Sequence, residues 1–98
     1  MYVKEGLLVT DDGYLPETIS VIPLEDYKIR VEFETGEVVT FDMTPYLDEP
    51  YFHGLRDKEI FNSVSCGGTH GPYWVNEELE LDAVMSLTTI WENGVHVK

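Results

Sequence analysis

Three histidines and a single cysteine are the residues whose types first suggest chemistry in this sequence. His53, His70, His96 and Cys66 are all potential zinc ligands. No two of them have the CxxC, HxxxH or HExxH spacing that brings two ligands to one turn or one helical face. Cys66 and His70 lie in one segment, but two glycines follow the cysteine and no second pair exists. The sequence therefore predicts no metal site, and instead a buried or partly buried thiol and an imidazole on a loop.

The Cys66 segment also suggests nucleophilic catalysis, with His70 as the base. Such a pair needs a hydrogen bond between thiol and base and a third group that orients the base, which closeness in sequence does not establish. The glycine-rich loop over residues 67–72 offers backbone N–H groups to an anion, but it lacks the lysine and the glycine spacing of a P-loop. We expect a connecting loop here and keep one alternative, a small-ligand or thiol site formed by Cys66, Gly67, Gly68 and His70.

Carboxylates are abundant enough that pairs of them occur by chance. One acidic run spans residues 77–82, and Asp11 and Asp12 form another. Glycosidase chemistry needs two carboxyls across a cleft, one of them with a pKa raised by burial. A calcium loop needs alternating oxygen ligands, a glycine and a terminal glutamate. Neither pattern is present, so these runs are expected to form solvated faces.

Aromatic residues are frequent in the second half of the chain. Because no basic residues are interleaved with them, they do not form a stacking platform for nucleic acid. The proline-framed stretch over residues 45–52 is apolar and hard to bury completely in a small domain. The candidate protein interface therefore consists of Tyr46, Leu47, Tyr51 and Phe52, with core packing as the alternative.

The overall charge is strongly acidic. The 98 residues include six Lys and Arg against nineteen Asp and Glu, so the net charge is −13. The basic residues are scattered among acidic neighbours, which excludes direct binding to nucleic acid or to an anionic membrane surface. A basic protein partner remains compatible with this charge. Since 43% of the residues are hydrophobic, a disordered chain is also excluded.

The sequence contains no sign of export. A single cysteine cannot form an internal disulfide, and the first residues lack a basic segment followed by a long apolar run. The longest apolar stretches are far shorter than the roughly 18 residues that span a bilayer. We therefore expect a cytoplasmic protein.

The clearest structural pattern lies in the first half of the chain. Apolar Tyr27, Ile29, Val31 and Phe33 alternate with charged residues, which predicts a strand with one covered face. A second strand follows over residues 37–42, and the loop between the two strands sets their register.

A two-residue loop, Thr35 and Gly36, sends Val39 and Phe41 to the charged face. A three-residue loop with Gly36 at positive φ keeps the larger apolar residues on one face, and we favour it. It pairs Phe33 with Glu37, Val31 with Val39 and Ile29 with Phe41.

Other elements are expected to be short. Residues 1–15 form a strand or an extended arm with a turn at Asp12 and Gly13, and residues 19–22 form a strand. A brief helix begins with Thr44 as its cap and Pro45 at its first position, and Asp57 caps a second helix over residues 59–61. Residues 64–66 resemble a strand end.

The C-terminal part of the chain is expected to contain one more strand and one more helix. Residues 73–75 form the strand, and Asp82 caps a last helix over residues 83–89, followed by a tail over residues 90–98. The whole chain is expected to be a single α+β domain, with a small antiparallel meander sheet and several short helices.

Three motifs, at residues 23–27, 31–37 and 41–43, resemble the small bacterial family catalogued as domain of unknown function 2442. That family has a proline and an acidic–aromatic pair before a strand, a strand that ends in Phe-acidic-X-Gly-Glu, and a strand that closes in Phe-Asp. Residues 55–64 resemble its helix-to-strand segment, and Tyr73 and Trp74 its Trp-bearing strand. The similarity covers about residues 19–87. Where many members continue with Pro-Asn-Gly, this chain has Val75, Asn76 and Glu77.

The resemblance implies an α+β domain with a meandering antiparallel sheet, and it carries over no catalytic residues. Some members resemble the N-terminal part of helix-turn-helix regulators. Others are encoded beside another small protein, in an arrangement similar to toxin–antitoxin pairs.

These observations lead us to expect a non-enzymatic, acidic protein-binding domain without a cofactor, antitoxin-like in pairing with a basic protein encoded nearby. The alternative is a small-ligand sensor or thiol enzyme at Cys66 and His70. A third hypothesis is self-association through a sheet edge or the residue 46–52 patch.

Overall fold

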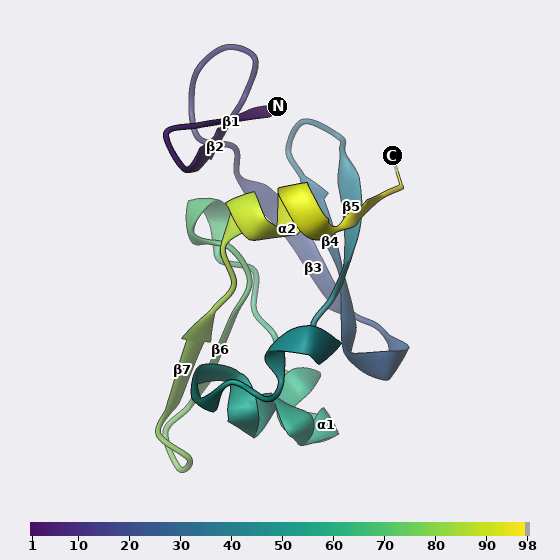
Figure 1. Cartoon of the computed structure of the whole chain (residues 1–98), viewed down its shortest axis with the longest axis vertical. Coiled ribbons are helices and arrows are strands. Elements are labelled where there is room, and N and C mark those ends of the chain that lie inside the picture. Colours follow the sequence, from purple (N-terminus) through teal and green to yellow (C-terminus); the bar gives the residue numbers. More distant parts are fainter. Residues whose placement is uncertain (98) are drawn as a thin grey trace.

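A four-stranded antiparallel sheet lies at the centre of the fold in the computed structural model, which describes residues 1–97 (Figure 1). The strand order is β3 (Thr18–Pro23), β4 (Lys28–Phe33), β5 (Val38–Asp42) and β8 (Val95–His96). Since β3, β4 and β5 are neighbours in both sequence and space, they form the meander that the sequence predicts. The antiparallel sheets and short helices confirm the α+β class.

The β4–β5 hairpin has the register that the alternation predicts. The expected pairs are present, Val31 with Val39 and Ile29 with Phe41. The N–H of Phe33 donates to the carbonyl oxygen of Glu37 at 2.9 Å. Gly36 has φ 91°, a left-handed conformation that glycine adopts without the steric cost of a Cβ atom. The three-residue loop is therefore confirmed.

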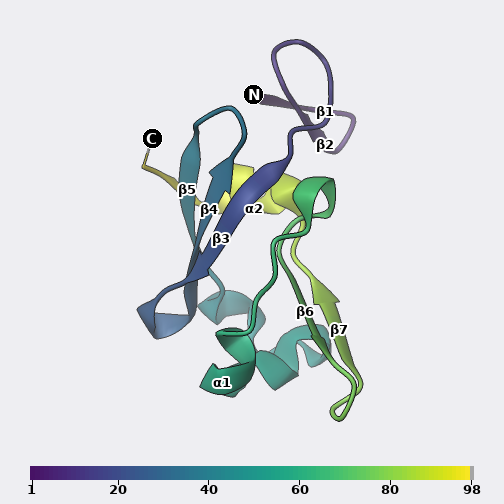
Figure 2. The same ribbon diagram turned by 180° about the vertical axis from the view of Figure 1, so that it is seen from behind.

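The helix α2 (Leu87–Asn93) crosses one face of this sheet, as the two opposite views show (Figures 1 and 2). Its buried residues are Leu87 and Ile90. The sheet contributes fully buried apolar side chains to the same core, namely those of Ile29, Val31, Phe33, Val39 and Phe41. Burial of a side chain of this size stabilises the fold by about 1.5–3 kcal/mol relative to leaving it exposed, so this layer is the main source of stability.

The N-terminal segment forms a hairpin of β1 (Tyr2–Lys4) and β2 (Leu7–Val9), which confirms a strand in the first fifteen residues. Leu8 is buried in the core, and the hydroxyl of Thr88 on α2 donates to the carbonyl oxygen of Gly6 at 3.1 Å. The predicted turn at Gly13 is also present, with φ 89°. The hairpin is thus docked onto α2.

A second hairpin consists of β6 (Tyr73–Asn76) and β7 (Leu81–Val84), so the helix predicted over residues 83–89 is wrong at its start and right only for residues 87–89, which belong to α2. Leu81 and Ala83 are buried, whereas Asp82 and Val84 are exposed. This alternation is the period of a strand rather than of a helix, and it lets Ala83 pair with Trp74. The predicted strand at residues 73–75 is confirmed.

The last helix begins at Leu87, and its cap is Ser86 rather than Asp82. The Ser86 hydroxyl accepts a hydrogen bond from the N–H of Thr89 at 3.5 Å. The tail expected from residue 90 onward is wrong for residues 90–93, which belong to α2. After α2, β8 pairs with β5 through Val95 and His96, while Lys98 lies outside the described residues.

Short helices connect β5 to β6. They are the 3₁₀ helices η2 (Thr44–Tyr46) and η3 (Pro50–Arg56) and the helix α1 (Lys58–Phe61). The predicted cap at Asp57 is confirmed, because its Oδ1 accepts the N–H of Glu59 at 2.9 Å.

The predicted cap at Thr44 is wrong. The carboxylate of Asp42 accepts the Thr44 N–H at 2.9 Å, so the preceding side chain satisfies this donor. Thr44 is the first residue of η2 and Pro45 the second.

The segment between α1 and β6 contains little regular structure. Ser65 forms an isolated bridge with Tyr73, which reduces the expected strand end to a single pair. The 67–72 loop includes one turn of 3₁₀ helix, η4 (Gly68–His70). Another such turn, η1 (Glu25–Tyr27), joins β3 to β4 and places Tyr27 just before the strand. No helix among the described residues is long and apolar enough to cross a membrane.

Candidate binding surface

The Cys66 thiol is used to attach its loop to the sheet. Cys66 is exposed, so the predicted burial of this residue is wrong. Its Sγ donates to the carbonyl oxygen of Thr18 at 3.1 Å and lies 3.2 Å from the Thr18 hydroxyl. That hydroxyl donates to the carbonyl oxygen of Gly68 at 2.9 Å. Among the described residues, no hydrogen bond joins this thiol to the His70 ring. The arrangement positions the loop against β3 and does not form a thiol–imidazole pair.

The glycines of this loop also have a structural use. A Cβ atom on Gly67 meets the carbonyl oxygen of Gly71 at 2.2 Å, a distance that side-chain-bearing residues do not reach. Gly67 therefore permits a close approach of two backbone segments. This accounts for the glycine without a bound anion.

The histidines lie apart from one another. The Nε2 of His96 is 2.7 Å from the carbonyl oxygen of Trp91, and its ring packs edge-on against the indole. His70 belongs to η4 and His53 to η3. Within residues 1–97, no group of three or more His, Cys, Asp or Glu side chains has the geometry to hold a metal ion.

The candidate interface over residues 46–52 is divided by the fold. Leu47 and Phe52 are buried in the core, and Tyr46 is half-buried. Tyr51 is 52% exposed, and its hydroxyl accepts the N–H of Val84 on β7 at 3.2 Å. A partner that contacts this stretch therefore meets Tyr51 and the outer part of Tyr46.

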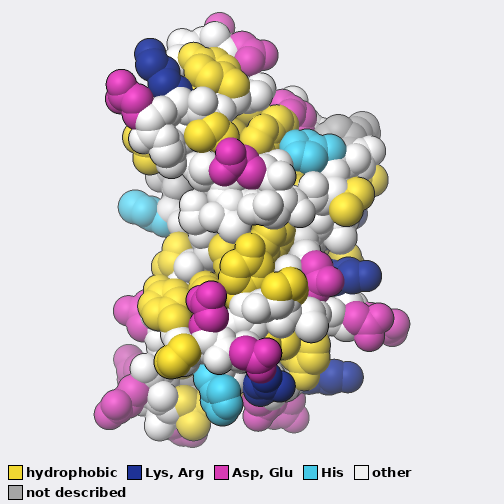
Figure 3. All heavy atoms as spheres, in the orientation of Figure 1, with side chains coloured by type: hydrophobic (Ala, Val, Ile, Leu, Met, Phe, Trp, Pro, Cys, Tyr) yellow, Lys and Arg dark blue, Asp and Glu magenta, His cyan; other side chains and the backbone are white. Residues whose placement is uncertain are grey.

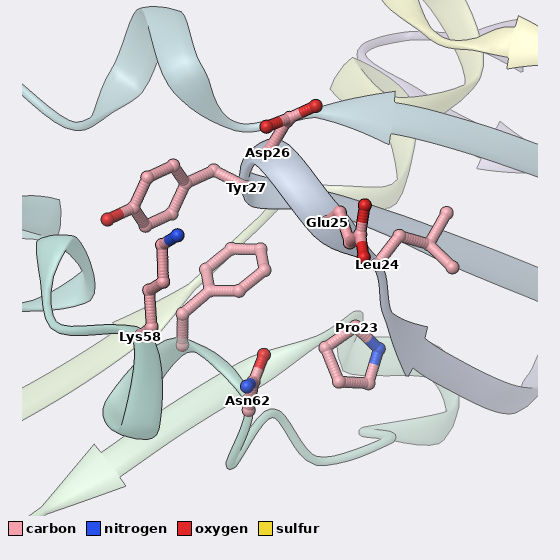
Figure 4. Close-up of a pocket in the computed structure, with 8 residues that line it drawn as sticks. Pro23, Leu24, Glu25, Asp26, Tyr27, Lys58 and Asn62 are labelled. Carbon is pink, nitrogen blue, oxygen red and sulfur yellow. The ribbon is translucent and has the colours of Figure 1, made fainter.

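Two surface hollows lie on opposite sides of α1. The first, the Tyr27 hollow, has a volume of about 700 Å³ and lies between the η1 turn and α1 (Figure 4). Lys58 extends toward Tyr27, and the carboxylate of Asp26 lies at the opposite end from Asn62. Its lining is mixed in charge, with Glu25 among the acids.

The Tyr27 hollow is built on a strained turn. Asp26 and Tyr27 both have φ 59°, which costs a residue with a side chain roughly 1–2 kcal/mol. Two contacts of the Tyr27 side chain hold this turn in place. The Tyr27 hydroxyl donates to the carbonyl oxygen of Arg56 at 2.5 Å, and its ring packs edge-on against Phe61. The strain is thus balanced by packing, and Tyr27 has a structural role.

The second hollow, here named the acidic hollow, has a volume of about 680 Å³ and lies between η3 and β7. Ile60 and Leu81 form apolar parts of its lining. The rim carries three carboxylates, two exposed apolar side chains and an imidazole, from Asp57, Glu80, Asp82, Tyr51, Leu79 and His53. It has no Lys or Arg in its lining. The acidic hollow therefore combines a negative rim with apolar walls.

The surroundings of the acidic hollow are also negative. Residues 48–59 and 77–82 together carry eight carboxylates against Arg56 and Lys58, and Arg56 forms an ion pair with Asp48. Figure 3 shows acidic and apolar side chains next to each other over the lower half of the molecule. A positive side chain that approaches this end is attracted by several charges at once.

The acidic surplus extends over the whole molecule. All nineteen carboxylates lie at the surface, where Glu32 and Glu37 are half-buried and the others exposed. Among residues 1–97 only two ion pairs are present, Arg56 with Asp48 and the N-terminal ammonium with Asp11. The fold therefore leaves most of its negative charge available to a partner.

One backbone edge of the β6–β7 hairpin is open beside the acidic hollow. On the other edge, Tyr73 exchanges hydrogen bonds with Ser65 at 2.8 and 3.0 Å. In an antiparallel pair, the backbone N–H and C=O groups of successive residues point alternately toward the partner strand and away from it. Val84 lies opposite Tyr73, so its N–H and C=O point away from β6, and the same holds for Asp82, two residues earlier. The hydrogen bond from the Val84 N–H to Tyr51 agrees with this direction. The N–H and C=O of Asp82 are left on the open edge.

The acidic hollow is not evident from the sequence, although several of the residues that line it have an expected role there. The 77–82 run is expected to form a solvated face, and Asp82 to cap a helix. The alternation of Leu79, Leu81 and Ala83 with polar residues was the available signal, since it predicts a strand with acids on one face. Nothing local indicated that η3 packs beside that strand.

Comparison with known proteins gives one match. The family model described as "Protein of unknown function (DUF2442)" matches residues 18–96. The β1–β2 hairpin precedes the matched region. No curated protein matches the chain, and neither does any solved structure.

Proposed function

Because the chain belongs to the DUF2442 family, whose function is unknown, we propose its role from its own surface: it is a non-enzymatic domain that binds a basic protein. The single observation that carries this proposal is the unneutralised acidic surface, with two ion pairs among the described residues for nineteen carboxylates. Such a surface steers a basic partner and raises its association rate.

The surface around the acidic hollow also provides short-range contacts, which long-range attraction between charges does not supply. Charge accelerates encounter, whereas the lifetime of a complex depends on buried aromatic and apolar contacts. Tyr51 and Leu79 are exposed beside the acidic hollow, so a partner drawn to the carboxylates also covers apolar surface. This combination favours a specific interface over a diffuse counter-charge.

Two alternative functions receive less support. For a thiol enzyme, the sulfur of Cys66 has to be free for chemistry, and it is hydrogen-bonded to Thr18. For self-association through the sheet, two chains of charge −13 have to approach each other, and the edge strand β3 ends in Pro23, which has no N–H to donate.

The gene arrangement of some members, as the family resemblance implies it, supports a partner that is a small protein encoded beside this one, with this domain in the antitoxin-like position. In that role the domain covers the basic surface of its partner and blocks its activity. Its acidic surface then performs the inhibition without any chemical step.

Co-expression with the adjacent gene product, followed by size-exclusion chromatography, tests the proposal. We expect a complex whose association rate falls steeply between about 50 and 500 mM salt, since the Debye length shrinks from roughly 14 to 4 Å. Absence of a complex at low salt overturns the proposal. A complex with a salt-independent association rate also contradicts it, because steering by charge is its basis.

A further inference from the structure

We propose that the acidic hollow receives an arginine side chain from an extended segment of the partner. This inference rests on the proposed function and goes further by naming the subsite and the side chain. The arginine stem lies along Leu79 and Leu81, and its guanidinium reaches Glu80 and Asp82.

The walls of the hollow suit a long aliphatic stem. Leu79 is 56% exposed and Leu81 lies at the boundary of the core, while Ile60 is half-buried. Arginine and lysine bury their methylene groups along such surfaces while the charged end stays near water. An acidic partner residue meets the three carboxylates of the lining and no Lys or Arg.

The rim supplies acceptors for the charged end. Glu80 and Asp82 are exposed and form no ion pair with any residue of the described chain. The carboxylate of Asp57 also lines the hollow and adds negative charge to it, although its Oδ1 accepts the N–H of Glu59. Hydrogen bonds between a guanidinium and a carboxylate are shorter and stronger than neutral ones.

The open edge of β7 explains why the segment is extended. The N–H and C=O of Asp82 point away from β6, so they pair with the backbone of a strand laid beside β7. In such a strand every second side chain points to the same face. The partner residue whose backbone pairs with Asp82 therefore determines which of the partner's side chains enters the hollow.

The aromatic ring favours arginine over lysine. Tyr51 lies at the rim with half of its surface exposed. A guanidinium is planar, stacks on aromatic faces and offers five donors in a fixed geometry, whereas an ammonium is a compact, strongly hydrated charge.

The Tyr27 hollow provides an internal contrast. Its volume is nearly the same, but Lys58 and Asn62 line it together with Glu25. A second cation there meets the charge of Lys58 (Figure 4). Size alone therefore does not select the acidic hollow, which differs in having three carboxylates and no Lys or Arg in its lining, whereas Lys58 lies beside Glu25 and Asp26 in the Tyr27 hollow.

The direct test titrates the whole protein with the blocked pentapeptide Gly-Leu-Arg-Leu-Gly and follows amide chemical shifts by NMR. We expect the amides of Tyr51, Leu79 and Asp82 to shift. The same peptide with citrulline, which keeps the shape and removes the charge, should bind about tenfold more weakly or not at all. The lysine peptide should lie between the two. Equal shifts with the citrulline peptide overturn the proposal.

Matched variants separate the hollow from general charge. Glu80→Gln with Asp82→Asn removes two charges from the rim, and Glu77→Gln with Glu78→Gln removes two from the tip of the same hairpin, outside the lining. We expect about a tenfold loss of affinity for the arginine peptide in the first variant and less than about threefold in the second. Similar losses in both overturn the proposal. Urea unfolding of both variants verifies that they are folded.

The same variants distinguish this inference from the proposed function. If the neighbouring protein binds with a steep salt dependence and the rim variant binds it equally well, the hollow is not the subsite and the proposed function stands. If that protein does not bind but the arginine peptide shifts the named amides, the hollow stands and the proposed function fails.

Discussion

The four-stranded sheet and the end of the molecule formed by η3 and the β6–β7 hairpin bury their apolar residues differently. In the sheet, Ile29, Val31 and Phe33 are fully buried under α2. In the hairpin, Trp74 and Ala83 on one face are buried, whereas Val75 and Val84 on the other face are exposed. Both regions use the same strand alternation, and both leave some apolar side chains exposed on the outer face, as Ile22 and Val95 do on the sheet, whereas those of the hairpin lie beside the acidic hollow.

We use this difference to divide the roles: the sheet provides stability, and under the proposed function the hairpin contacts a partner. The face of a half-buried strand that points away from the core is normally polar, because it contacts solvent. The β6–β7 hairpin retains valines on that face, surrounded by carboxylates and beside a hollow. These residues add little to folding, and under the proposed function they contact a partner. The following variants test this division.

The largest expected effect contrasts one apolar residue from each region. Phe41→Ala removes a fully buried ring from the sheet and should lower the free energy of unfolding by about 3–5 kcal/mol. Val84→Thr on the exposed face of the hairpin should change it by less than about 0.5 kcal/mol. Urea denaturation followed by circular dichroism measures both. Comparable losses would show that the hairpin face is part of the core.

A second contrast uses the two tryptophans. The indole N–H of Trp74 donates to the buried carbonyl oxygen of Phe61 at 2.9 Å, so Trp74→Phe leaves that oxygen with the longer hydrogen bond from the Val64 N–H at 3.3 Å and should cost about 1–3 kcal/mol. Trp91 is half-buried and packs edge-on against Phe33, so Trp91→Phe should cost less. Each variant retains one tryptophan, whose fluorescence reports unfolding. An equal cost in both would remove the role assigned to this hydrogen bond.

A third contrast compares the helix caps of the two regions. Asp57 caps α1 with a hydrogen bond of 2.9 Å, while Ser86 caps α2 with one of 3.5 Å. We expect Asp57→Ala to cost about 1 kcal/mol and Ser86→Ala about half of that. Thermal unfolding gives both values. The reverse order would mean that packing, rather than the cap, holds α1.

The smallest effect concerns pH. Partial burial acts to raise the pKa of Asp42, but hydrogen bonds from Thr44 and the nearby charge of Lys28 outweigh it and hold the pKa below its usual value. The folded state therefore binds this proton less readily than the unfolded state does, so the contribution to stability is present above the unfolded pKa, near 4, and disappears as the pH falls through the folded pKa.

The variant Asp42→Asn should lack this dependence. Its stability should decrease less than that of the parent protein between about pH 5 and 3, by a small margin because Asp42 is exposed and solvent screens it. Urea midpoints at several pH values measure the difference. Parallel curves for the two proteins would contradict the assignment.

Several features were readable from the amino-acid order alone because their physical causes are local. The alternation around Val31 and the need for positive φ at Gly36 determine the β4–β5 register, since a slip of one residue exposes every apolar side chain. Asp57 caps α1 because its acceptor lies two residues from the donor. The acidic character is a matter of composition.

Other features depended on contacts between distant segments. The alternation of Leu81 and Ala83 with polar residues favours a strand but is short, and pairing with Trp74 and Asn76 on β6 is what stabilises the strand. Phe52 is buried because the fold packs its segment against the core.

The acidic hollow exists only because η3 and β7, far apart in sequence, lie beside each other. Local order thus specifies turns, caps and faces. The neighbours available in three dimensions decide which apolar residues remain exposed, and two of these, Tyr51 and Leu79, lie on the surface that we assign to a partner.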